Sequence, residues 1–350
     1  MKKRILVAPL NWGLGHATRC IPIINALIRH EFEPVIACDG TALALLKKEF
    51  PTLESIELPS YNINYSNKGY LIKLKMIKDA PKLLKAIKSE KKAVESIVRT
   101  QAIDGIISDN RLGVYSKKVL SIYLTHQLHV LSGNTTWLST KLHQKYIKQF
   151  NECWVPDFSG ASNLSGKLGH LNIPNITLKY IGPLSRFESV KCDVIYDILI
   201  LLSGPEPQRT QLEEKLLTLF KTYKGKVLFV KGVVEDKQTK TEIGAMTIYN
   251  FMTSKQLEKS LNESDLILSR SGYTTIMDVA KLGKKAFFIP TPGQFEQEYL
   301  AKRLTKQNLV PSCKQDEFTI EKLKEANKFE GLETMVNEID YKRLFSVFRA

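Results

Sequence analysis

Short runs of aliphatic residues alternate with longer segments of helical periodicity through most of the chain, and this alternation limits the folds open to it. The pattern predicts strands at 4–10, 33–38, 53–58, 104–109 and 119–125 and helices at 17–30 and 41–49. A second series predicts strands at 197–202, 226–230, 245–250, 265–269 and 285–290 and helices at 208–222, 254–262 and 273–282. Strands that alternate with helices form βαβ units and a parallel sheet. We therefore expect two doubly wound α/β domains.

The two series are separated by a polar segment with a Gly-Pro pair, which is typical of a linker. We predict an N-terminal domain at 1–182, a linker at 183–193 and a C-terminal domain at 194–350. The last helix of the chain is a candidate to pack back on the N-terminal domain. A chain of 350 residues is long enough for two domains with a core each.

The composition favours a globular protein of a reducing compartment. Hydrophobic residues make up 43% and charged residues 25% of the chain, and no apolar run reaches the roughly 18–20 residues that span a bilayer. The five cysteines are far apart and form no CxxC pair, which argues against a disulfide scaffold and against a zinc site. We expect a cytoplasmic protein.

The net charge of +15 has its densest source in residues 68–92, which hold nine lysines and two acids. Apolar residues are interleaved with these lysines, and Pro81 is expected to interrupt or start a helix. A basic amphipathic segment can lie on an anionic membrane surface, although it can also be the solvated face of a helix. The segment has no arginine and a single aromatic residue, which disfavours nucleic acid as a partner.

Two glycines and a histidine, Gly13, Gly15 and His16, follow the first predicted strand and begin the first predicted helix. Three interpretations stay open. The loop partly matches a dinucleotide fingerprint, with Asp39 as the ribose acid of an NAD site. It can also be a plain turn. In the third interpretation it is a substrate loop, because ligands gather at this edge of a sheet and the positive helix end favours a neutral imidazole.

A second motif, Arg270-Ser271-Gly272, lies between a predicted strand and a helix that carries Asp278. A helix N-terminus of this kind can bind phosphate through backbone N–H groups. A carboxylate on the same helix can accept hydrogen bonds from ribose hydroxyls. The following segment, PTPGQFEQE, supplies polar side chains suited to a sugar, namely Gln294, Glu296, Gln297 and Glu298.

Residues 266–304 resemble the C-terminal domain of family 28 glycosyltransferases. The resemblance lies in Arg270-Ser271-Gly272, the acid Asp278, the Phe288-Ile289-Pro290 segment and Gln297, and Gly15-His16 resembles the end of the family's N-terminal glycine-rich loop. It implies a GT-B fold, with two doubly wound Rossmann-like domains that face a central cleft. It also implies that the C-terminal domain holds a UDP-sugar.

The resemblance assigns the donor-binding residues as follows. Ser271 and Gly272 would face the diphosphate, with Arg270 of the same motif also donor-binding. Asp278 would face the ribose, Gln297 and Glu298 the sugar, Phe251 and Met252 the uracil, and Ser203 and Gly204 a phosphate. The sequence departs from the family at three points. The 202–209 loop has one glycine and the acid Glu206, Asp278 replaces a glutamate, and Arg19 replaces a proline.

The implied reaction is an inverting, metal-independent transfer of N-acetylglucosamine or another hexose to an acceptor hydroxyl, without a cofactor. The chain has no Asp-x-Asp pair of the kind that binds a divalent metal in such enzymes. His16 is the first candidate for the base and Asp109 the second, and Gly13, Gly15, Asn110 and His126 are expected on the acceptor side. The acceptor is expected to be lipid-linked and the protein peripheral to the inner membrane. A UDP-sugar 2-epimerase and a non-catalytic sugar-nucleotide-binding protein are the alternatives.

Overall fold

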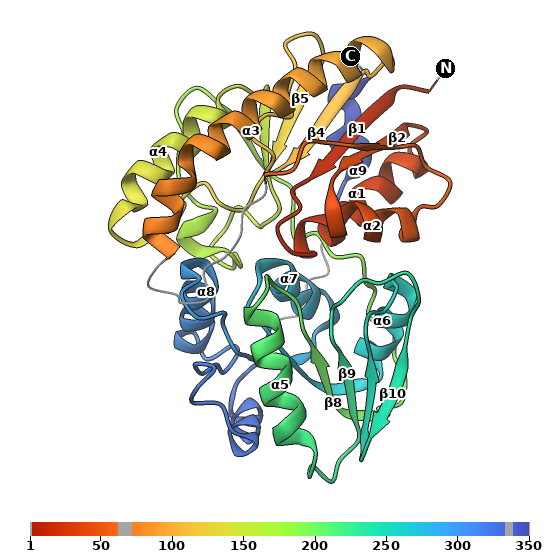
Figure 1. Cartoon of the computed structure of the whole chain (residues 1–350), viewed down its shortest axis with the longest axis vertical. Helices are drawn as coiled ribbons and strands as arrows, with labels where there is room; N and C mark the ends of the chain where they lie inside the picture. Colours follow the sequence, from red (N-terminus) through yellow and green to blue (C-terminus); the bar gives the residue numbers. More distant parts are fainter. Residues whose placement is uncertain (1, 62–71, 333–338, 350) are drawn as a thin grey trace. The chain divides into compact units, whose positions relative to one another are not determined.

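The computed structural model describes residues 2–61, 72–332 and 339–349, with the backbone alone for 72–80. The described residues form two compact units (Figure 1). Unit 1 holds residues 2–61, 72–184 and 339–349, and unit 2 holds residues 185–332. Among the described residues, the chain passes into unit 2 at Ser185 and residues 339–349 belong again to unit 1.

Unit 1 is built on a parallel sheet whose strand order is β3-β2-β1-β4-β5-β6-β7. Its strands are β1 (Arg4–Pro9), β2 (Glu33–Cys38), β3 (Ser55–Glu57), β4 (Gly105–Asp109), β5 (Leu120–Leu124), β6 (Glu152–Val155) and β7 (Thr177–Tyr180). The α-helices of the unit are α1 (Gly15–Arg29), α2 (Gly40–Glu49), α3 (Ile72–Thr100), α4 (Thr136–Ile147) and α9 (Tyr341–Leu344).

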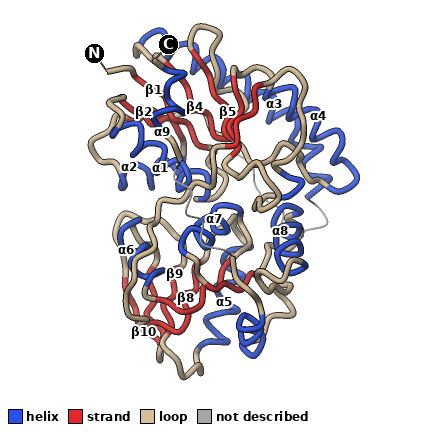
Figure 2. The backbone as a smooth tube through the Cα atoms, turned by 180° about the vertical axis from the view of Figure 1, so that it is seen from behind, coloured by secondary structure: helices blue, strands red, loops and turns tan. Residues whose placement is uncertain are grey.

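Unit 2 is built on a second sheet, of order β10-β11-β9-β8-β12-β13, in which β10 alone runs antiparallel to its neighbour. Its strands are β8 (Tyr196–Leu201), β9 (Val227–Val230), β10 (Lys240–Ile243), β11 (Met246–Tyr249), β12 (Ser264–Ser269) and β13 (Lys285–Phe288). The α-helices are α5 (Gln208–Phe220), α6 (Ser254–Asn262), α7 (Tyr273–Leu282) and α8 (Phe295–Lys306). Figure 2 shows the strands of each unit gathered into one sheet with helices outside it.

The two predicted α/β domains are confirmed, and most predicted strands and helices lie within two residues of their positions. Three strands were not predicted: β6, the edge strand β7 of the first sheet, and the polar, exposed edge strand β10 of the second. All three are four residues long and lack the long apolar run that marks a central parallel strand. The expected break at Pro81 is wrong, since α3 continues through this residue.

The core of unit 1 has an apolar layer on each face of the sheet. Leu6 packs with Val94 and Val98 of α3. Ile5 points to the opposite face because side chains alternate along a strand. On that face a Cβ at Gly105 would lie 2.6 Å from Phe348 and 3.0 Å from Ile5, so a glycine is needed there. The C-terminal residues of the chain therefore cover one face of the first sheet.

Both sheets have a topological switch point, where neighbouring strands are connected in opposite directions. In unit 1 it lies between β1 and β4, where Pro9 is in register with Asp109. In unit 2 it lies between β8 and β12, where Leu201 is in register with Ser269. Ligands of open α/β sheets bind beyond the carboxyl ends of the strands at these points. The candidate residues of both motifs follow these four strands.

Candidate functional site

Asp109, the last residue of β4, is the centre of a buried polar cluster in unit 1. Its side chain is fully buried, and Arg19 of α1 donates to both carboxylate oxygens, from Nε to Oδ2 at 2.5 Å and from Nη2 to Oδ1. Cys20 donates to Oδ2 at 3.5 Å. Burial by itself raises the pKa of Asp109, but the charge of Arg19 and the hydrogen bonds from Arg19 and His16 outweigh burial and hold this pKa below its usual value. Asp109 is therefore an ionised hydrogen-bond acceptor.

His16, in the first turn of α1, lies with Nδ1 2.8 Å from Asp109 Oδ1. Nη2 of Arg19 also lies 2.9 Å from this Nδ1, but the same Nη2 already donates to Asp109 Oδ1. Since an ionised carboxylate can only accept, we assign the proton to Nδ1, which donates it to Asp109 and leaves the lone pair on Nε2. No described residue contacts Nε2 by a hydrogen bond, and the side chain is 14% exposed. Burial lowers the pKa of His16 below its ordinary value despite Asp109, so the ring is neutral at pH 7. A neutral imidazole oriented by a carboxylate is the arrangement of a general base.

Arg19 also joins His126, which follows β5, to the same cluster. Its Nη1 lies 2.9 Å from His126 Nδ1. Because a guanidinium only donates, Nδ1 of His126 must accept, and the proton of the neutral ring is on Nε2. Asp109 and Arg19 thus fix opposite tautomers in the two histidines. His16 keeps its lone pair on Nε2, and His126 keeps an N–H group there.

The other residues expected on the acceptor side border this cluster. Gly13 has a φ of 76°, which a glycine adopts readily, and α1 begins at Gly15 without a side-chain cap. Asn110 has a φ of 57°, and its Oδ1 is buried without a hydrogen-bond partner among the described residues. An unpaired buried amide oxygen is costly, and a ligand hydroxyl would satisfy it.

In unit 2, Arg270, Ser271 and Gly272 lead from β12 into α7. Ser271 is fully buried and its Oγ donates to the carbonyl of Gln297 at 2.9 Å. A Cβ at Gly272 would meet no atom within 4 Å, so the space before the helix is open. Since α7 begins without a side-chain cap, its first N–H groups, and not the Ser271 hydroxyl, are what the motif offers to a phosphate.

The guanidinium of Arg270 is buried and turned into the protein. It donates to the carbonyls of Gln208, Ile289 and Pro290 and to Oε1 of Gln315, at 2.8–3.2 Å. Burial lowers its pKa to about 10, which still leaves it charged at pH 7. Arg270 thus links the segments at Gln208, 289–290 and Gln315. Its positive charge lies inside unit 2, and its guanidinium is occupied by these contacts.

Asp278, on the second turn of α7, is half-buried and accepts a hydrogen bond of 2.7 Å from Ser185. Burial raises its pKa to about 7, although Arg186 and Ser185 act in the opposite direction. The carboxylate therefore changes its charge near physiological pH, and ligand hydroxyls that donate to it would favour the ionised form.

The loop after β8 contains Ser203 and Gly204, whose φ is 110°. The carboxylate of Glu206, in the same loop, accepts hydrogen bonds from Arg209 at 2.6 Å and from Thr210 at the start of α5. Thr291 lies 4.0 Å from the position of a Cβ on Gly204, and its buried Oγ1 has no partner in the described part of the chain. Ser203, Gly204 and Thr291 thus form an open polar edge.

The Gln/Glu cluster begins α8. Gln297 is buried and its Oε1 accepts from the Thr291 amide at 2.9 Å, while Glu298 accepts from the Gly293 amide at 2.8 Å. Gln294 Oε1 is buried with no partner among the described residues. Gln297 and Glu298 therefore shape the 291–294 turn, and Gln294 is the member that still needs a hydrogen bond.

Phe251 and Met252 lie between β11 and α6, and both are buried. The Phe251 carbonyl accepts from Gln238 at 2.7 Å, and Met252 Sδ accepts from Ser260 at 3.6 Å. The main-chain groups of Met252 have no hydrogen-bond partner within the described ranges, so they are available to a planar base.

Sequence reasoning overlooked Arg19, Thr291 and Ser185 as parts of these sites. Only the first left a signal, because it replaces the proline of the resembling family. Asp39, the acid of the dinucleotide interpretation, lies in the structure against Arg111 at 2.6 Å and Asn11 at 3.2 Å.

Residues 2–61, 72–332 and 339–349 contain neither a metal-ligand cluster nor a membrane-spanning helix. No group of three or more His, Cys, Asp or Glu side chains in these ranges is arranged to hold a metal ion. Within the same ranges, the helices are too short or too polar to cross a membrane.

Comparison with known proteins agrees with this geometry. Residues 208–338 match the model of the glycosyltransferase family 28 C-terminal domain. A UDP-N-acetylglucosamine–N-acetylmuramyl-(pentapeptide) pyrophosphoryl-undecaprenol N-acetylglucosamine transferase of Buchnera aphidicola is 24% identical over 57% of this chain and 54% of its own length. A Methylobacterium radiotolerans protein of the same name is 34% identical over 20% of this chain and 19% of its own length. The chain thus spans about half, or less, of the curated relatives it matches.

Several solved structures of glycosyltransferases share this fold. The glycotransferase of kitacinnamycin superposes with a TM-score of 0.62 at 13% identity, covering 100% of this chain and 95% of the other. MurG of Acinetobacter baumannii superposes with a TM-score of 0.58 at 12% identity, covering 100% and 99%. The fold is therefore that of the GT-B glycosyltransferases. Within this fold, residues 208–338 are the part of the chain that matches the family 28 C-terminal domain.

Proposed function

We propose that the protein is a glycosyltransferase that takes a UDP-sugar in unit 2 and an acceptor hydroxyl in unit 1. The observation that carries the proposal is the family 28 C-terminal domain at 208–338, which contains the uncapped start of α7 and the half-buried Asp278. A diphosphate matches the N–H groups of a helix start, and a ribose matches a carboxylate on the same helix.

The donor is proposed to be UDP-N-acetylglucosamine. The names of both relatives describe an N-acetylglucosamine transferase and contain UDP-N-acetylglucosamine. The main-chain groups of Met252 would pair with uracil, and the Ser203–Gly204 edge with Thr291 would receive a phosphate. Gln294, whose amide oxygen is unpaired, is the residue of the cluster suited to a sugar hydroxyl.

The proposed reaction is a direct displacement with inversion. The acceptor oxygen forms a bond to the anomeric carbon while the bond from that carbon to the diphosphate oxygen breaks, and UDP leaves with the electron pair. Nε2 of His16 takes the acceptor proton, and Asp109 and Arg19 hold the ring. Asp109 is proposed to orient the base rather than to be the base, because its pKa lies below the usual value. The N–H groups of α7 stabilise the departing charge, so transfer is expected to proceed without a divalent metal.

A lipid-linked acceptor and an anionic membrane surface are part of the proposal. The part of 68–92 before residue 72 lies outside the described residues, but α3 beyond it presents the exposed side chains of Lys82, Leu84, Lys85 and Lys88. Next to α3 lies α4 (Figures 1 and 2), which exposes Trp137 by 67%, Leu138 by 60% and Leu142 by 46%. Exposed apolar side chains with lysines around them fit the interface of an anionic membrane. The protein would then act at the cytoplasmic face.

The test is calorimetric titration in EDTA with UDP, UDP-N-acetylglucosamine, UDP-glucose and NAD. We expect the wild type to bind UDP and one UDP-sugar and Asp278→Ala to bind neither, while Asp265→Ala, at an exposed acid of β12, binds like the wild type. Binding of NAD with no response to UDP would overturn the proposal. Incubation of the bound sugar nucleotide alone, followed by analysis of the sugar, separates transfer from 2-epimerisation.

A further inference from the structure

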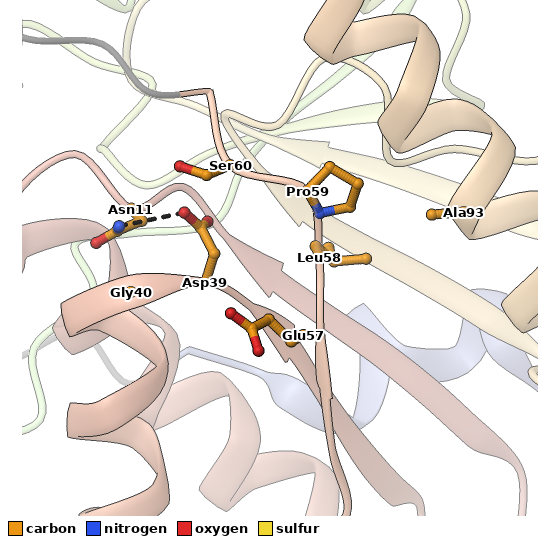
Figure 3. A pocket seen from close by; sticks show the side chains of 8 residues that line it. All are labelled: Asn11, Asp39, Gly40, Glu57, Leu58, Pro59, Ser60 and Ala93. Carbon is orange, nitrogen blue, oxygen red and sulfur yellow. Dashed lines mark hydrogen bonds between the residues drawn. The ribbon is translucent and has the colours of Figure 1, made fainter.

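A pocket of about 740 Å³ opens in unit 1 at the carboxyl ends of β2 and β3 (Figure 3). It is lined by Asn11, Asp39, Gly40, Glu57, Leu58, Pro59, Ser60 and Ala93. Its volume is in the range of small-molecule sites. None of the residues assigned to the proposed reaction above lines it, so it is a separate feature of this unit.

The polar wall of the pocket is held rigidly. Asn11 accepts at Oδ1 from the Thr41 hydroxyl at 3.1 Å and from the Ala42 amide at 3.2 Å, and it donates to Asp39 Oδ2 at 3.2 Å. Asp39 also accepts at Oδ1 from buried Arg111 at 2.6 Å. A wall that is ordered before a ligand arrives costs little entropy on binding.

The carboxylates of the pocket wall can still accept further hydrogen bonds. An ionised carboxylate has about four lone-pair sites, of which the two described contacts of Asp39 use one on each oxygen. Glu57 is exposed and has no hydrogen-bond or ion-pair partner among the described residues. A ligand that fits must therefore bring several donors, as a ring with neighbouring hydroxyls does.

The charge of the pocket excludes an anionic ligand. No Lys or Arg is among the described residues that line it. The guanidinium of Arg111 is fully buried and committed to Asp39, Glu90 and the carbonyls of Pro9 and Pro59. A phosphate would meet Glu57 without a compensating cation, which disfavours a dinucleotide or a sugar phosphate. The apolar side chains of Leu58, Pro59 and Ala93 suit the C–H face of a sugar ring.

We propose that this pocket binds a neutral sugar ring through its hydroxyl groups, as a carbohydrate subsite for the acceptor. Glu57 and Asp39 accept from neighbouring ring hydroxyls, and Leu58 and Pro59 pack on the ring face. The role as an acceptor subsite rests on the proposed transferase function, whereas the binding of a sugar does not.

The experiment measures binding to the full chain by saturation-transfer NMR, with no nucleotide present. The probes are the methyl glycosides of glucose, galactose, mannose and N-acetylglucosamine, together with glucose 1-phosphate and NAD. We expect saturable binding of at least one glycoside and no binding of glucose 1-phosphate at the pocket. Glu57→Gln should weaken the glycoside about tenfold, because a charge-assisted hydrogen bond is worth roughly 1.5–3 kcal/mol. Ala93→Leu should abolish saturable binding by filling the pocket.

Two matched variants control for general effects. Glu33→Gln makes the same charge change at the opposite end of β2, and Ala86→Leu makes the same size change two turns earlier in α3. Both should bind the glycoside as the wild type does. The proposal is overturned if no glycoside binds, if Ala93→Leu binds normally, or if NAD binds and is lost on Glu57→Gln. Failure of UDP-sugar binding would overturn the transferase function and leave this result unchanged.

Discussion

Arg19 in α1 and Asp109 at the end of β4 form a buried ion pair across 90 residues of sequence, with Arg19 Nε 2.5 Å from Asp109 Oδ2 and Nη2 donating to Oδ1. Both side chains are almost fully buried. The pair joins the first turns of α1 to the switch point of the first sheet, and the two histidines of the cluster are hydrogen-bonded to it. It therefore determines both the stability of this edge and the tautomers of the rings.

Removal of Arg19 is expected to destabilise unit 1. Arg19→Met leaves the Asp109 carboxylate buried without its cation, which costs about 3–5 kcal/mol. Urea unfolding followed by tryptophan fluorescence measures this, because Trp12, Trp137 and Trp154 all belong to unit 1. Lys179→Met, which breaks the more exposed pair with Glu152, should cost less than about 1 kcal/mol. Equal losses in the two variants would contradict the prediction.

The base role of His16 predicts a separation of catalysis from donor binding. His16→Gln should lower kcat by about 10²–10⁴-fold and leave UDP-sugar affinity unchanged, because the ring lies in unit 1. Since burial lowers the pKa of His16, kcat at saturating donor and acceptor should stay level from pH 8 to about 6.5 and fall only at lower pH, as the ring gains a proton. An inflection above pH 6.5 that disappears in His16→Gln would show that the ring is not neutral as described.

Asp278 predicts a pH dependence of donor affinity. Its pKa of about 7 means that the acceptor form of the carboxylate is scarce at pH 6 and dominant at pH 8. Affinity for UDP-N-acetylglucosamine, whose diphosphate does not titrate in this range, should rise about tenfold between these two pH values. Calorimetric titration measures this, and Asp278→Asn should give weak, pH-independent binding. A level profile in the wild type would mean that Asp278 does not hold the ribose.

The exposed face of α4 predicts membrane binding that depends on both apolar and basic residues. Trp137→Ala with Leu138→Ala should reduce sedimentation of the protein with vesicles of one-third phosphatidylglycerol. Lys141→Gln should weaken it about fivefold, since each cation near such a surface contributes about 1 kcal/mol. Val194→Ala, which removes an exposed apolar side chain of unit 2, is the control. Equal sedimentation with neutral phosphatidylcholine vesicles would speak against the electrostatic part.

Some of the site could be predicted because its residues lie at the ends of strands that the sequence marks clearly. Asp109 ends a buried apolar run, and His16 follows the first such run by a short loop, so a parallel sheet brings both to one edge. The same logic brought Gly204, Gly272 and Asp278 to the edge of the second sheet. The direction of each side chain could not be predicted, as Arg270 shows by turning into the protein and Glu206 by turning to Arg209.

The sequence by itself determined the two α/β units, because alternating periods of apolar residues are local patterns that act within ten or twenty residues. It also determined the resemblance of residues 208–338 to the family 28 C-terminal domain, because the Arg270–Gly272 motif and Asp278 lie close together in the chain. Only the tertiary structure decided the partners: Arg19 with Asp109 and His126, and Arg111 with Asp39 and Glu90. These pairs depend on the order of strands in the sheet and on burial, which changes the free energy of each charged side chain. Neither the strand order nor the burial can be read from a local stretch of sequence.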